Sequence, residues 1–563
     1  MLCDTAEGVW ERTVNAIKWK IRGSLNWALL LNYIVFLILV CLFQPYFETN
    51  DDSAMRMTVS GAGGYYDSHL IYINILIGKL IVFLETHVPT GNWYTLIQLI
   101  IVFFSLCTVT YILIERSGIK YGSWISLILL TFFGYEGYIA VQFTKTAGFA
   151  AAAGMMLFVY AVTENSKNQE LAYYMAAAAL ITIGSMMRFE MALTAIAVFA
   201  GSLFIEDVKN TWKSKGATPP KSVKWILLFI ILVLIFGCKE YSKSCYTKEK
   251  DWRAFTEFNY FRSELLDYGF PDYAQNQSLY EEVGWTQEDL NFYKSWNIAD
   301  SEKFQVETLK AVAHAKQKKR LHLQLIKDFF CEFMEHNAAC TLFYIWLIFI
   351  VIFILGGSRK SGGIILYTSF TAIAFHLYLF WQGRYFIRRV DLAFLFIIVC
   401  CMFFHWRPIP VGEHAVILCT FVFLLVNSIT YEGKHVEPET VREARVLIEA
   451  LSEDEEHLYA APMFHLRPDI AYGAYDSVPF GVMDNMISMG GWKTGSPLIN
   501  HILDSYGVQN IYRDIVNNDR VYLLTYQANP ESTLAYIQRH YAPNAYVTEE
   551  KRIGNYYIFA VHE

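Results

Sequence analysis

The chain has 563 residues, of which 54% are hydrophobic, 16% aromatic and 18% charged. A soluble domain ordinarily carries about 25% charged residues, so this composition favours an integral membrane protein. The formal net charge of -7 is small for the length and argues against a nucleic-acid-binding surface. The sequence also contains no P-loop, dinucleotide fingerprint or zinc-ligand spacing.

Long apolar runs dominate the first three quarters of the chain. A helix needs about 20 apolar residues to cross a membrane, and eleven candidates lie at 26–46, 93–114, 122–141, 146–163, 170–187, 190–205, 223–238, 339–356, 363–381, 390–405 and 411–428. The first run follows Lys18, Lys20 and Arg22 and ends without a small-residue cleavage site, which predicts a signal anchor with a cytoplasmic N-terminus. We therefore expect a mainly α, polytopic membrane protein with about 11 transmembrane helices.

A shorter apolar patch at 70–84, which contains Lys79, decides the topology. If this patch spanned the membrane, the lysine-rich loop 207–222 would face outward, against the positive-inside rule. If it lies on the outer surface as an amphipathic helix, that loop becomes cytoplasmic. The second arrangement is favoured, and it places 47–92, 239–338 and everything after Ile429 outside the cytoplasm.

The last part of the chain differs in composition from the rest, because spanning runs cease at about Glu432. A helix at 438–451, a strand at 457–462 and a final strand at 555–561 predict a soluble extracytoplasmic α/β domain over 431–563. Residues 1–430 then form the transmembrane module, with outer loops 47–92 and 239–338. Within the second loop, Leu309 with Val312 and Leu321 with Leu325 have helical spacing among lysines, which predicts helices on the membrane surface.

Three acidic residues follow the first span, where the chain leaves the membrane: Glu48, Asp51 and Asp52. One interpretation is structural, with Asn50 or Asp51 as the N-cap of a short helix. The other is catalytic, with a carboxylate that serves as a general base for a hydroxyl group. The segment by itself leaves both open.

The order of these elements resembles the GT-C fold of glycosyltransferases: seven spans before a large outer segment, a carboxylate pair on the first outer loop, and an interfacial helix after it. The resemblance covers about residues 25–430, and Asp51 and Asp52 match the acidic pair of the family. It implies transfer of a sugar from a polyprenyl-phosphate donor, with Asp51 as the base. Asp52 would orient Asp51 or hold a divalent cation.

A second polar set lies on the short outer loops and comprises Glu136, Lys145, Arg188 and Glu190. Ionisable groups near the apolar region are costly unless they are paired or functional. Arg188 and Glu190 could pair with each other, or bind substrate. Glu136 corresponds loosely to the acid that the family places on its second outer loop, although it is displaced toward the span.

Three arginines occur at 384, 388 and 389, on a loop expected to face outward. A topology error, snorkelling of long side chains and a phosphate site each explain them. The phosphate interpretation is favoured for Arg384 ahead of Arg388 and Arg389. By the family resemblance, the lipid phosphate would leave toward Arg384 and Lys145.

Two aromatic segments remain ambiguous. The one at 252–273 fits a protein core or an interfacial belt better than a sugar site. The other, Gly490 to Lys493, could be an acceptor platform or a turn.

The sequence thus predicts an inverting membrane glycosyltransferase of the cell envelope, with a surface glycan or lipid as acceptor. The main alternative is a transporter or flippase of a lipid-linked sugar, and a non-catalytic scaffold is a third. A transporter favours charges near the bilayer midplane and two related halves. Here the charges gather at the outer ends of spans and no internal repeat is evident, which favours the enzyme.

Overall fold

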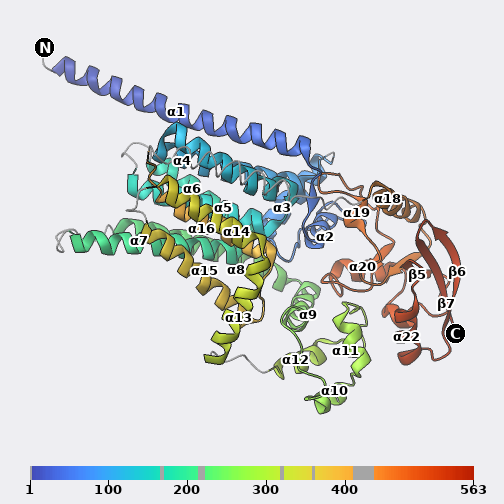
Figure 1. The fold of residues 1–563 in the computed structure, drawn as a ribbon. Helices are drawn as coiled ribbons and strands as arrows, with labels where there is room; N and C mark the ends of the chain where they lie inside the picture. The colour runs from blue at the N-terminus through green and yellow to red at the C-terminus, as the bar shows by residue number, and fades with distance from the viewer. Residues whose placement is uncertain are drawn as a thin grey trace.

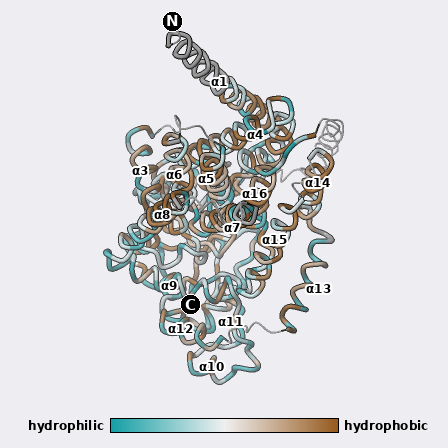
Figure 2. The backbone as a smooth tube through the Cα atoms, turned by 90° about the vertical axis from the view of Figure 1, so that its left-hand side faces the viewer, coloured by the Kyte–Doolittle hydropathy of each residue, from teal (hydrophilic) through white to brown (hydrophobic). Residues whose placement is uncertain are grey.

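The computed structural model describes residues 3–89, 91–164, 170–213, 222–316, 323–357, 362–409 and 437–563. These residues form a long helix bundle with an α/β domain beyond one end, whereas the N-terminus lies beyond the other end (Figure 1). Hydrophobic residues are concentrated on the bundle helices, and hydrophilic ones are frequent over the outer segments (Figure 2). The division into an apolar bundle and a polar end agrees with the mainly helical membrane architecture expected from composition.

The bundle is built from long apolar helices. They are α1 (Cys3–Leu42), α4 (Trp93–Gly134), α5 (Phe143–Glu164), α6 (Glu170–Met187), α7 (Phe189–Lys213), α8 (Ser222–Lys248), α14 (Thr341–Gly356), α15 (Gly362–Gln382) and α16 (Arg388–Phe404). Of the described helices, five are long and apolar enough to cross a membrane, or six if the bent pair Leu323–Asn337 and Thr341–Gly356 is one span.

The predicted number of eleven spans therefore stays a prediction. One of the five long helices, Trp93–Ile139, contains two predicted spans, and its backbone breaks at Gly118, where φ is 80°. A left-handed φ of this kind costs glycine little, and it divides the helix where the sequence predicted a loop. The predicted span 411–428 lies outside the described residues.

Small residues place α5 at the centre of the bundle. A methyl group at Gly148 would come within 2.8 Å of Ala393 on α16, and one at Gly154 within 2.8 Å of Ile181 on α6. Close approach of this kind is how small residues mediate helix packing in membranes. Because α5 packs tightly on two sides, its first turn is held in place at the end of the bundle nearest the carboxy-terminal domain.

Short elements cover the end of the bundle nearest the carboxy-terminal domain. They are β1 (Tyr46–Phe47), α2 (Asn50–Val59), α3 (Ile75–His87), the π-helix η1 (Tyr135–Ile139) and β2 (Ala140–Val141). β1 and β2 pair in parallel, with Tyr46 opposite Ala140, and the Glu48 amide donates to the Val141 carbonyl at 3.1 Å. This pairing aligns the chain after α1 with the start of α5 and brings together acidic and basic residues that are distant in sequence.

The carboxy-terminal residues form a five-stranded sheet in the order β4-β3-β5-β7-β6. β3 is parallel to β4 and β5, and β7 is antiparallel to β5 and β6. The elements are α18 (Pro438–Ser452), β3 (Leu458–Ala461), α19 (Pro468–Ala471), β4 (Met486–Ser488), α20 (Pro497–Ser505), α21 (Ile511–Asp514), β5 (Val521–Tyr526), α22 (Glu531–His540), β6 (Tyr546–Ile553) and β7 (Tyr556–His562). The helix and two strands predicted at 438–451, 457–462 and 555–561 match α18, β3 and β7.

The segment between α8 and α14 is not an isolated loop, because part of it shares a hydrophobic core with this sheet. Its helices are α9 (Lys250–Leu266), α10 (Gln277–Glu282), α11 (Gln287–Lys294), α12 (Val306–His314) and α13 (Leu323–Ala339). Leu309 and Val312 are fully buried in the shared core. The expectation that this pair lies on a membrane surface was wrong, because helical spacing marks an apolar face without showing whether lipid or protein covers it.

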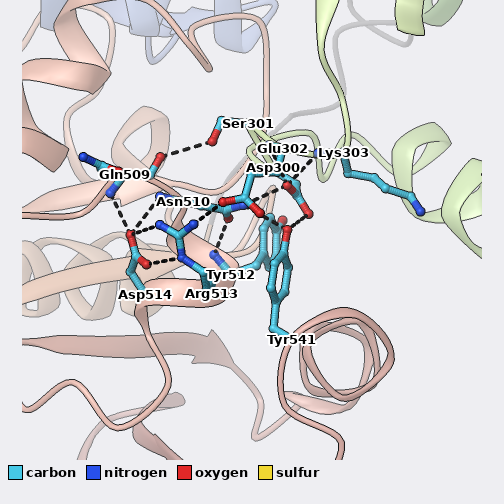
Figure 3. Close-up of polar contacts among 10 residues, drawn as sticks. All are labelled: Asp300, Ser301, Glu302, Lys303, Gln509, Asn510, Tyr512, Arg513, Asp514 and Tyr541. Carbon is cyan, nitrogen blue, oxygen red and sulfur yellow. Dashed lines mark hydrogen bonds and ion pairs between the residues drawn. The ribbon is translucent and has the colours of Figure 1, made fainter. Parts of the chain in front are cut away.

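The α9–α12 segment and the carboxy-terminal sheet domain together are called here the outer unit, because they lie beyond the end of the bundle. A buried carboxylate, Asp300, links these two parts (Figure 3). It accepts hydrogen bonds from the Asn510 side chain at 2.9 Å and from the Tyr536 and Tyr541 hydroxyls at 2.7 and 2.6 Å. The backbone amides of Glu302 and Lys303 donate to it as well, at 3.0 and 2.9 Å. A buried charge with five donors fixes its surroundings, since losing any partner leaves a polar group unpaired.

Candidate active site

Two cavities meet where the bundle, α2 and the outer unit come together. The first, of about 600 Å³, contains three arginines and is called here the arginine-lined cavity. The second, of about 680 Å³, lies between α2 and loops of the carboxy-terminal domain and is called the domain-side cavity. Both are lined by the same six residues: Thr49, Asn50, Met463, Phe464, Gly491 and Trp492. The two cavities are therefore adjacent and meet at these six residues.

Asp51 lies in the first turn of α2 and lines the arginine-lined cavity. Its Oδ2 atom is 3.9 Å from a guanidinium nitrogen of Arg389. Burial raises the pKa of the Asp51 carboxyl, while the charge of Arg389 and a hydrogen bond from Trp492 oppose this rise. The N-cap of α2 is Thr49, and so the capping role considered for Asn50 or Asp51 was wrong. Asp51 is a carboxylate at a helix start that faces a cavity.

Asp52 is fully buried and points away from the cavities into the protein. Its Oδ1 atom accepts hydrogen bonds from the Tyr94 hydroxyl at 2.9 Å, the Gln98 amide at 3.2 Å and the Phe143 backbone amide at 3.1 Å. The Thr49 hydroxyl donates to Oδ2 at 3.5 Å. Burial raises the pKa of Asp52 to about 7, against these hydrogen bonds. Asp52 thus fastens α2 to α4 and α5.

Three arginines that line the arginine-lined cavity differ in how their charge is compensated. Arg188 pairs with Glu190 at 3.1 Å, as the structural alternative for these two residues proposed, although both also line the cavity. Arg389 faces Asp51. Arg384 lies over the ring of Tyr268 at 5.4 Å and makes no ion pair with any described residue. Arg384 is therefore the guanidinium in this cavity whose charge is most available to a ligand.

Glu136 and Lys145, both predicted to bind substrate, are buried members of a cluster of four charges that also contains Glu48 and the half-exposed Arg388. The Lys145 ammonium lies 2.6 Å from Glu48 and 2.8 Å from Glu136. Arg388 contacts the same two carboxylates, at 3.3 Å from Glu48. Among the described residues that line the two cavities, neither Glu136 nor Lys145 is present. Because each charge in the cluster has two opposite partners, the cluster links the segment after β1 to η1, α5 and α16.

Sequence reasoning did not identify several residues at the junction. Met463 and Phe464 had no distinguishing pattern, and Phe464 is 57% exposed with a φ of 70°. Trp492 was considered as an acceptor platform or part of a turn; it lies at the junction and contacts Asp51. The tertiary fold brings these residues to α2 from a distant part of the chain, so no local sequence pattern identifies them.

The acidic pair does not offer two carboxylates to one cation. Asp52 is occupied by hydrogen-bond donors, and Asp51 faces an arginine. Within the described residues, no group of three or more His, Cys, Asp or Glu side chains is placed to hold a metal ion. The residues present therefore do not fit the divalent cation considered for Asp52.

No family model and no curated protein matches the chain. Among solved structures, it is similar to ArnT from Cupriavidus metallidurans in the apo state, with a TM-score of 0.42 and 12% identity over 97% of this chain and 98% of that one. It is also similar to ArnT from the same organism bound to undecaprenyl phosphate, with a TM-score of 0.41 and 11% identity over 94% and 97%. A likeness of this degree does not assign a function, so the function is inferred from the residues of the chain itself.

Proposed function

We propose that the protein is a GT-C-type membrane glycosyltransferase that moves a sugar from a polyprenyl-phosphate donor to a hydroxyl of a cell-surface glycan or lipid, with inversion, on the outer face of the membrane. One observation carries this proposal: Asp51 lines one cavity together with Arg384, which makes no ion pair with any described residue, and that cavity meets a second one beside Asp51. A base, a site for a leaving anion and room for two substrates are the parts that such a transfer needs.

The donor phosphate fits the arginine-lined cavity. As the bond between the sugar and the phosphate oxygen breaks, negative charge grows on the phosphate. A guanidinium offers paired donors to phosphate oxygens, and within the described part of the chain Arg384 has no carboxylate partner that would compete. Apolar residues of this cavity, among them Phe375 and Leu379 on α15, suit the first isoprene units of a lipid.

The acceptor fits the domain-side cavity, with its hydroxyl directed at the junction. Asp51 accepts the proton of that hydroxyl as the oxygen bonds to the anomeric carbon and the lipid phosphate leaves from the opposite face. This single displacement inverts the anomeric centre. The Asp51 carboxylate is held for this task by its neighbour Asp52, which anchors the first turn of α2.

The test is transfer by the purified full chain in detergent, with a panel of synthetic polyprenyl-phosphate hexoses and pentoses and a cell-envelope extract as acceptor. We expect release of polyprenyl phosphate and a product with inverted anomeric configuration. Arg442→Ala serves as a matched control for arginine variants, because Arg442 is 75% exposed on α18 and lies outside both cavities. Movement of intact donors across vesicles without release of the phosphate would favour the transporter instead.

A further inference from the structure

One charged side chain of the domain-side cavity has no close partner among the described residues. Four charged side chains line it: Glu48, Arg467, Asp469 and Lys493. Glu48 pairs with Lys145 and Arg388. Arg467 and Asp469 form a bidentate ion pair, in which two guanidinium nitrogens donate to the two carboxylate oxygens at 3.0 and 2.9 Å. Lys493 makes no ion pair or side-chain hydrogen bond with any described residue, so it is the one positive charge on this lining without a close partner among them.

The acidic group that acts most on Lys493 is Asp67, but its carboxylate is committed elsewhere. Asp67 Oδ1 lies 2.6 Å from both the backbone amide and the Nδ1 atom of His69. Burial lowers the pKa of Lys493 to about 8, which still leaves the ammonium mostly charged at neutral pH. A partly buried ammonium without a close partner is costly, and an anionic ligand would remove that cost.

The backbone around Lys493 is held in a fixed position. A methyl group at Gly490 would come within 1.9 Å of the Trp296 carbonyl oxygen, and the Gly491 amide donates to that oxygen at 3.3 Å. The amide of Ser496 donates to the Lys493 carbonyl at 3.0 Å. Lys493 also follows Trp492 directly, and Trp492 contacts Asp51. A group bound at Lys493 is therefore one residue away from the side chain that touches the proposed base.

We propose that Lys493 is a specificity-determining residue, and that the domain-side cavity takes an acceptor that carries an anionic group, a phosphate or a carboxylate, near the hydroxyl that is glycosylated. This inference rests on the proposed function and names its acceptor class. A lysine suits a single anionic group, because its ammonium is a point charge with three rotatable donors. The phosphate could belong to a lipid headgroup or to a phosphorylated glycan, and both present the same chemistry to Lys493.

Binding to the full chain in detergent tests the acceptor class with defined probes. Dihexanoyl phosphatidic acid is the anionic probe, dihexanoylglycerol is its neutral counterpart, and inorganic phosphate is the competitor. Lys493→Gln should weaken binding of phosphatidic acid about tenfold or more, as expected for losing a hydrogen bond to a charged group. Lys493→Arg should retain most of the affinity, and the exposed Lys294→Gln on α11 should behave as wild type.

A separate arm addresses the donor side, so that failure of one idea is not read as failure of the other. Farnesyl phosphate should bind the arginine-lined cavity and lose affinity in Arg384→Ala but not in Lys493→Gln. Loss of that pattern would count against the proposed donor site alone. Competition by inorganic phosphate would support the inference and show that the anion is recognised by itself, whereas phosphatidic acid binding without such competition would support a lipid headgroup.

Two results would overturn the inference. One is equal affinity of Lys493→Gln and wild type for phosphatidic acid. The other is binding of dihexanoylglycerol as tight as that of phosphatidic acid to the wild type. Either would mean that the cavity accepts a neutral molecule and that Lys493 has a structural role.

Discussion

Replacing Asp51 by asparagine should abolish transfer while leaving the fold intact. The amide keeps the size of the carboxylate but cannot take a proton from the acceptor hydroxyl. Removing a general base typically costs about a hundredfold to ten-thousandfold in rate, which corresponds to about 3 to 5 kcal/mol of barrier. The ion pair lost with Arg389 spans 3.9 Å and is partly exposed to solvent, so its loss should cost less than about 1 kcal/mol of stability.

Asp52 provides the matched comparison, because it is the neighbouring carboxylate and lines neither cavity among the described residues. In Asp52→Asn, the amide oxygen can still accept from Tyr94, Gln98 and Phe143, so both activity and stability should change little. In Asp52→Ala, three donors within 3.2 Å lose their acceptor. At about 1 kcal/mol or more for each buried donor, the loss should reach about 3 kcal/mol.

The pH dependence separates the two carboxylates further. Transfer needs ionised Asp51, so the rate should fall as pH decreases through a pKa that lies above the ordinary 3.8. Asp52 has a folded-state pKa of about 7, so the stability that it contributes is present below about pH 4 and is lost as pH rises through 7. Asp52→Asn should remove that part of the pH dependence of unfolding.

The assay is single-turnover transfer by purified, monodisperse variants, with thermal unfolding and donor binding measured on the same samples. Near-normal transfer in Asp51→Asn would refute its role as base. If Asp52→Asn alone were inactive, the base would be Asp52, and the assignment of Asp52 as an anchor would be wrong.

Three further outcomes are expected. Arg384→Ala should lower turnover about a hundredfold or more, by analogy with loss of one oxyanion donor. Arg384→Lys should restore turnover only in part. Unchanged turnover relative to the control Arg442→Ala would leave snorkelling of the Arg384 side chain as the explanation. Lys145→Met should destabilise the protein by about 3 to 5 kcal/mol, because two buried carboxylates lose one of their two cationic partners. Thermal unfolding with and without a second Glu136→Gln change would check this. In a background without reactive cysteines, an impermeant thiol reagent added outside should label Asn291→Cys but not Lys209→Cys, and the reverse pattern would contradict the topology.

Local sequence patterns predicted the apolar helices of the bundle and several elements of the carboxy-terminal domain. Apolar runs of sufficient length marked helices such as α5 and α7, since burying apolar surface and satisfying backbone hydrogen bonds within one segment require no distant partner. The helix at 438–451 and the strand at 457–462 were predicted from local apolar periodicity, although the backbone hydrogen bonds of the strand are made to the distant β4 and β5. The acidic pair stood out because carboxylates directly after a span are conspicuous in sequence.

The sequence left the function of each acidic residue undecided, and the tertiary structure separated them. Asp51 and Asp52 are adjacent in sequence, but successive residues of a helix point in different directions, so one faces a cavity and the other is buried. Helical spacing likewise marked Leu309 and Val312 as one apolar face, while the fold decided that protein rather than lipid covers it.

Long-range pairing was beyond the sequence altogether. The ion pairs of Glu48 with Lys145 and Arg388 could not be assigned from spacing, because they depend on how the segment after β1 packs against α5 and α16. The approach of Trp492 to Asp51 depends in the same way on the docking of a carboxy-terminal loop against α2. The sequence by itself determined which segments are helical and apolar, whereas the tertiary structure decided which charges neutralise each other and which face the cavities, since electrostatic energy depends on distance in space and not on position along the chain.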